Sequence, residues 1–94
     1  MEIKMSEHQI AVLYMLNTKK SVSNADLIEI LELAQIIEYF LGLDILYGFE
    51  RQGLVLIDEN KVFNITQKGQ ELCALLEKRL PDIIKERIKQ SCVA

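Results

Sequence analysis

Apolar residues recur at helical spacing along most of the chain, and this pattern predicts a mainly helical protein. Ser6 is expected to begin the first helix, because Gln9 stands three residues later and completes a capping box. Ser23 and Asp26 have the same spacing and predict the start of a second helix. Residues 21–23 are expected to form a short extended piece between the two. The apolar sides of these helices would consist of Ile10, Leu13, Tyr14, Leu16, Leu27, Ile28 and Leu31.

A third helix is predicted over residues 38–52, followed by a β-hairpin. Its buried face is expected at positions i, i+3, i+4 and i+7, which are Gly42, Ile45, Leu46 and Phe49. Gly53 is expected to end this helix, because glycine adopts a positive φ at no steric cost. Residues 54–57 and 61–65 would form the two strands, with the acidic residues of the tip between them.

A fourth helix is expected after Thr66, a favourable N-cap residue. Pro81 would break that helix and serve as the first residue of a last one, over residues 82–92. On this last helix, Ile84 and Ile88 stack at i and i+4. They would either cap the core of the domain itself or pair with a twin helix in a homodimer, and we favour the dimer.

The chain contains no linker-like stretch, low-complexity segment or internal repeat. Its 94 residues are therefore expected to form a single domain. Within it, residues 1–80 would be the core and residues 81–94 a C-terminal helix with a possible role in dimerisation.

The order of segments after the third helix resembles a winged helix-turn-helix domain. It consists of Gly53-Leu54-Val55, the hairpin, and Ile65-Thr66-Gln67-Lys68-Gly69. The chain is more closely similar to a family of uncharacterised proteins, mainly from Gram-positive bacteria, that are described as predicted transcriptional regulators. This resemblance also involves residues 38–40 and 79–86 and covers nearly the whole chain. It implies a mainly α fold of about five helices with a small β-hairpin as a two-stranded wing, and a DNA-binding regulator domain.

In a winged helix the third helix lies in the major groove and the wing tip contacts the backbone. Opposite the expected core face, the third helix carries Leu43, Asp44, Tyr47 and Arg51. Tyr47 and Arg51 would lie nearest the DNA, and Lys61 of the wing would contact the backbone. Members of the resembling family often carry polar residues on this face, where this chain has Leu43, Tyr47 and Gly48.

The charge of the chain leaves a second function open. The net charge is -3 and the pI is about 5.1, which argues against strong non-specific DNA binding. Asp58 and Glu59 stand at the tip of the hairpin, where they would either repel phosphates or simply be solvated. The basic residues gather near the C-terminus, where a solvated helix face is favoured over a phosphate-contacting patch. The alternative is a winged helix that has lost DNA binding and serves as a protein-interaction or dimerisation module.

Nothing in the sequence predicts catalysis. His8 is the sole histidine, and Cys73 and Cys92 form no CxxC pair. There is also no GxSxG, glycine-rich phosphate loop or metal-ligand cluster. We therefore expect no enzyme activity, cofactor, metal or evident small-molecule ligand. The cysteines predict a cytoplasmic protein with reduced thiols, and no apolar run approaches the roughly 18 residues of a membrane span.

Overall fold

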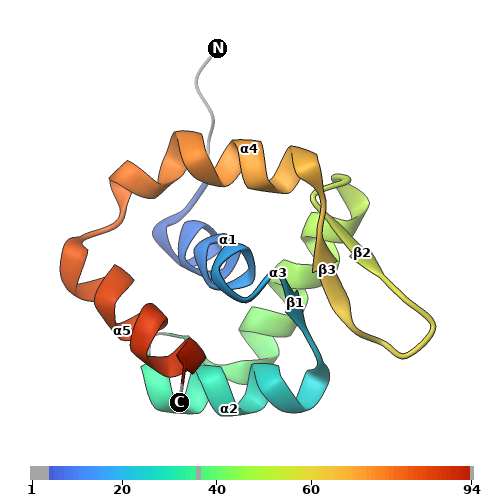
Figure 1. Cartoon of the computed structure of the whole chain (residues 1–94), viewed down its shortest axis with the longest axis horizontal. Coiled ribbons are helices and arrows are strands. Elements are labelled where there is room, and N and C mark those ends of the chain that lie inside the picture. Colours follow the sequence, from blue (N-terminus) through green and yellow to red (C-terminus); the bar gives the residue numbers. More distant parts are fainter. Residues whose placement is uncertain (1–4, 36, 94) are drawn as a thin grey trace.

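The first helix, α1 (Glu7–Lys19), lies at the centre of the structure, with the other elements around it (Figure 1). The computed structural model describes residues 5–35 and 37–93. After α1 the chain forms β1 (Ser21–Val22), α2 (Asn24–Ala34), α3 (Tyr39–Arg51), β2 (Val55–Ile57), β3 (Phe63–Ile65), α4 (Gln67–Leu76), the 3-10 turn η1 (Glu77–Arg79) and α5 (Asp82–Val93). The predicted fold class, a mainly α protein of winged-helix type with a small β wing, is confirmed.

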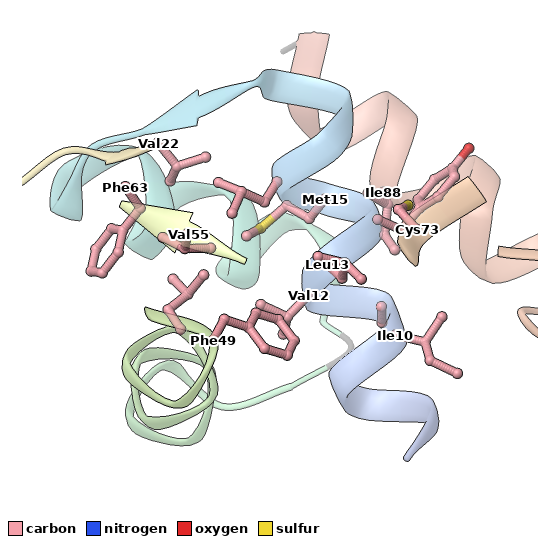
Figure 2. Packing of buried hydrophobic residues seen from close by; sticks show 14 of the residues in the cluster. Ile10, Val12, Leu13, Met15, Val22, Phe49, Val55, Phe63, Cys73 and Ile88 are labelled. Atoms are coloured by element: carbon pink, nitrogen blue, oxygen red, sulfur yellow. The ribbon is translucent and has the colours of Figure 1, made fainter. Parts of the chain in front are cut away.

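The central helix α1 is buried on all sides. Seven consecutive residues, from Ile10 to Leu16, are withdrawn from solvent. The helix contacts α3, α4, α5, β1 and β3, and its side chains lie between Phe49 and Val55 on one side and Cys73 and Ile88 on the other (Figure 2). The predicted apolar stripe was therefore too narrow. It omitted Ala11, Val12 and Met15, which are covered because α2 and α5 pack over that face.

The last helix, α5, packs against α1 and α2 in the same molecule. Ile88 is only 2% exposed, and Ile84 is half-buried against the same core. The prediction that Ile88 forms a dimer interface is wrong, because its side chain already fills the core of the monomer. The alternative, in which this helix caps the core of the domain itself, is what the structure has.

The chain leaves α4 earlier than expected, at Leu76, and passes through η1 before Pro81. Leu80 has extended backbone angles, because a residue that precedes proline is disfavoured in the helical region. The carbonyl oxygen of Pro81 accepts hydrogen bonds from the backbone of Ile84 and Lys85. Pro81 thus stands just before α5 rather than inside it, and the corner formed by η1 turns α5 back over α1.

The three strands form an antiparallel sheet in the order β1-β3-β2. The extended piece predicted over residues 21–23 is confirmed as β1, in which Val22 pairs with Phe63. The strands of the wing are shorter than predicted. Leu54 is part of the α3 cap, and Lys61 takes a φ of 63° inside the turn, so neither continues the ladder.

Gly53 ends α3 as predicted, with a φ of 78°. The N–H of Leu54 donates to the carbonyl of Phe49 and the N–H of Gly53 to that of Glu50, each at 3.0 Å. This pair of bonds is a Schellman motif. Leu54 and Phe49 are both buried, as its accompanying apolar contact requires.

The start of α4 closes onto this helix end. Thr66 caps α4 by accepting from the N–H of Gly69, and its hydroxyl donates to the carbonyl of Gly53 at 2.8 Å. The ammonium of Lys68 donates to the carbonyl of Gln52 at 3.1 Å. A Cβ on Gly69 would overlap the carbonyl oxygen of Leu54 and come within 2.8 Å of Ile65 Cγ1. Residues 66–69 therefore join the start of α4 to the end of α3, to Leu54 and to Ile65 of β3. We call these contacts the α3–α4 junction.

Two glycine substitutions test the α3–α4 junction. Gly69→Ala is expected to lower the free energy of unfolding by about 1–3 kcal/mol, because the new methyl group forces the strand and helix apart. Gly48→Ala is the matched control, since a Cβ there meets only Arg51 Nη2 at 3.8 Å. In the interior of α3 this change should raise stability by about 0.8–1 kcal/mol. Urea unfolding followed by circular dichroism measures both, and equal effects would contradict the close approach at Gly69.

Candidate nucleic-acid interface

The third helix shows one face to the core and one to solvent. Gly42, Leu46 and Phe49 are buried and Ile45 is half-buried, so the predicted core face is confirmed. Gly42 permits close packing on α2, because a Cβ there would lie 2.7 Å from Leu31 Cδ1. On the opposite face Asp44, Tyr47 and Arg51 are exposed as predicted, whereas Leu43 is half-buried because it packs against the core.

Three of the predicted contact residues lie together. Leu43, Tyr47 and Lys61 line one groove of about 170 Å³ with Asn24 and Phe63. The ring of Tyr47 packs edge-on against Phe63 of β3, with ring centroids 5.7 Å apart and an interplanar angle of 73°. The strand thereby fixes the position of the tyrosine. We call this site the wing groove, since it lies between α2, α3 and the wing.

Asn24, the first residue of α2, was missed by the sequence analysis. Its carbonyl oxygen Oδ1 accepts a hydrogen bond of 2.7 Å from the hydroxyl of Tyr39. Among the described residues the side-chain amide nitrogen of Asn24 makes no hydrogen bond, so its N–H groups are available for another acceptor. The wing groove therefore gathers an ammonium, a phenol and an amide from three different elements. Such donors suit a phosphate oxygen.

The start of α2 does not by itself bind an anion here. Ser23 accepts from the N–H of Asp26, and the Asp26 carboxylate accepts in turn from the N–H of Ser23. This capping box is the one predicted, and it satisfies backbone donors that would otherwise face a ligand. Any affinity of the wing groove for phosphate must come from the side chains.

The other two predicted contact residues, Asp44 and Arg51, lie in a different cleft. This cleft of about 480 Å³ runs between the first turn of α1 and α3, and it also contains His8, Gln9 and Gly48. The structure thus divides the predicted set between two sides of the exposed face of α3. Leu43, Tyr47 and Lys61 are on the wing side, and Asp44 and Arg51 are on the α1 side.

The wing tip is organised by Asp58. Its carboxylate accepts from the backbone N–H groups of Asn60 at 2.8 Å and Val62 at 3.1 Å, and from the side-chain amide of Asn64 at 3.4 Å. The hydrogen bond from Val62, together with those from Asn60 and Asn64, lowers the pKa of Asp58 from 3.8. This acid therefore has a structural role in the turn that presents Lys61.

The basic residues near the C-terminus lie away from this face. They stand on η1 and α5, and α5 lies at the opposite end of the longest axis from the wing (Figure 1). Arg79 donates to the carbonyl of Met5 at 3.1 Å, and Lys85 pairs with Asp82 at 3.9 Å. A duplex lying along α3 and the wing would not contact them.

Within residues 5–35 and 37–93, no three His, Cys, Asp or Glu residues stand close enough to hold a metal ion. Cys73 and Cys92 are free and buried. Burial, with the negative charge of Glu77, raises the pKa of the Cys73 thiol to about 11. None of the helices in these described residues is long and apolar enough to cross a membrane.

The lowered pKa of Asp58 gives a pH test of the wing tip. The ionised carboxylate stabilises the tip above the unfolded pKa of 3.8, and this contribution is lost as the pH falls through the lower folded value. The backbone amide signals of Asn60 and Val62 should therefore titrate in NMR spectra with a midpoint below 3.8. In Asp58→Ala this titration should vanish. Its persistence in the variant would contradict the assignment.

Comparison with known proteins identifies a family. The model of a family described as a domain of unknown function (DUF4364) matches residues 8–94, from α1 to the end of the chain. Searches of curated proteins and of solved structures found no match.

Proposed function

The chain belongs to the DUF4364 family, whose description gives no activity. From the surfaces of the chain itself, we propose that it is a DNA-binding transcriptional regulator domain of winged-helix type. It would act as a binding domain in the cytoplasm and not as an enzyme. Homodimerisation stays a prediction, and its interface cannot include Ile88, which is buried in the monomer.

The observation that carries the proposal is the wing groove. Asn24, Tyr47 and Lys61 converge there from α2, α3 and the wing. In helix-turn-helix proteins the recognition helix lies in the major groove while flanking elements contact the backbone. Lysine, tyrosine and asparagine side chains are among the usual phosphate partners. A phosphate in the wing groove would bring the exposed face of α3 against the base edges.

The charge of this face sets the expected strength of binding. Lys61 lines the wing groove and Arg51 lines the cleft on the other side of α3, and the chain as a whole carries a net charge of -3. Each neutralised phosphate adds about -0.9 to the slope of log K against log salt, so two cations predict a slope of about -2. Non-specific affinity should be low, and binding should depend on contacts to particular bases.

A second candidate, a protein-interaction module, is favoured by one specific observation. Phe40, Leu41 and Tyr47 on α3 are 72%, 44% and 42% exposed. Asp44 and Glu50 lie on the same helix and are also exposed. An apolar and acidic helix face of this kind suits a basic, apolar segment of another protein.

Binding of duplex DNA at low salt tests the first candidate against the second. The domain should bind a pool of random duplexes weakly, with the shallow salt slope given above. In Lys61→Asn the affinity should fall about fivefold and the slope should lose about one unit, because one phosphate contact is removed. Asparagine tolerates the positive φ of this position, so the turn should remain.

Lys89→Gln is the charge-matched control, because Lys89 is exposed on α5 at the far end of the molecule. It should leave the affinity unchanged. Equal losses of affinity in Lys61→Asn and Lys89→Gln would show that any basic residue contributes equally to binding. This result would contradict the wing groove as the site of phosphate contact. Absence of binding at low salt would reject the first candidate and leave the second.

A further inference from the structure

Phe40 is the most exposed of the large apolar side chains in the described part of the chain, at 72%. It is the second residue of α3, and its ring packs edge-on against Tyr39 with centroids 5.2 Å apart. Tyr39 is in turn held by its hydrogen bond to Asn24. The ring of Phe40 is therefore supported from α2 while its surface faces solvent. A supported side chain loses little conformational entropy when a ligand covers it.

Asp44 follows Phe40 by four residues and lies on the same exposed side of α3. Among the residues that the structure describes, its carboxylate has no hydrogen bond or ion pair, and in its ionised form it can only accept hydrogen bonds. Phosphates repel such a group, so it cannot contribute to general attraction for DNA. It can contribute to discrimination between bases, because an unsatisfied acceptor is penalised against every base that offers no donor.

The base edges of the major groove match these two side chains. The amino group at N4 of cytosine donates to aspartate, and the methyl group of thymine makes apolar contacts with phenylalanine. Residues at the start of a recognition helix are the ones that contact base edges. Four residues rise by about 6 Å along a helix, which is close to two base-pair steps.

We propose that the first half of α3 selects its DNA site through a cytosine and a thymine within about two base pairs, with Asp44 accepting from the cytosine amino group and Phe40 covering the thymine methyl group. This inference rests on the proposed function. It also accounts for the acidic character of the helix, since the carboxylate lowers affinity for other sequences while it is satisfied at the correct one.

The experiment begins with selection of binding sites from randomised duplex DNA by the full chain, followed by the same selection with two variants. Asparagine pairs with adenine. Asp44→Asn should therefore change one selected position from cytosine to adenine. The ratio of the affinities for the cytosine site and the adenine site should change about tenfold. In the wild-type site, replacing the thymine by deoxyuridine removes only a methyl group and should weaken binding about threefold. Phe40→Ala should bind the thymine and deoxyuridine duplexes equally.

Ile83→Ala is the matched apolar control, since Ile83 is 66% exposed on α5, away from the wing. It should keep the wild-type preferences at both positions. Circular dichroism should show that all three variants fold, because each altered side chain is at the surface.

The outcomes separate this inference from the proposed function. If sites are enriched and both α3 variants keep the wild-type preferences, DNA binding stands and the base assignment is overturned. If no site is enriched and no duplex binds at low salt, the proposed function fails and this inference fails with it. A change at the predicted positions, confined to the α3 variants, supports the inference.

Discussion

The arrangement of the exposed face depends on the α3–α4 junction. The hydroxyl of Thr66 bonds to the carbonyl of Gly53 while it accepts from Gly69, so one side chain joins the end of α3 to the start of α4. The close approach of Gly69 to Leu54 fixes the same joint sterically. Because β2 and β3 run between these two points, the junction sets the angle of the wing to α3. The contact of Tyr47 with Phe63, and with it the wing groove, follows from that angle.

Burial of α1 on all sides has a consequence for function. Since α5 covers α1 and α2, the domain uses its last helix to complete its own core, while Phe40, Leu41 and Tyr47 of α3 stay exposed. The basic residues that accompany η1 and α5 are thereby carried to the end of the molecule that is remote from the wing (Figure 1). The face proposed to contact DNA is therefore poor in positive charge. Recognition of DNA by this face would therefore rest on a few placed donors, on apolar contact and on the proposed discrimination by Asp44.

Local signals were sufficient for much of the fold, and they failed where a contact depended on distant parts of the chain. The capping boxes at Ser6 and Ser23 and the glycine cap at Gly53 were predicted, because each is set by its immediate neighbours. The place of Ile88 was not, since the same spacing fits a core and a dimer interface, and only the packing of α5 on α1 decides between them. Asn24 was also missed, because its role depends on a hydrogen bond to Tyr39, fifteen residues away. The one signal for it was a side-chain amide directly after the cap residue of α2.

Contact of DNA with the exposed face of α3 and the wing can be tested by chemical-shift mapping of the isotope-labelled domain with the duplex that it binds best. The largest changes in chemical shift are expected at Asn24, Tyr47 and Lys61 of the wing groove and at Phe40 and Asp44 of α3. Signals from η1 and α5 should stay in place. Changes confined to Lys78, Arg87 and Lys89, with α3 and the wing unaffected, would contradict this contact.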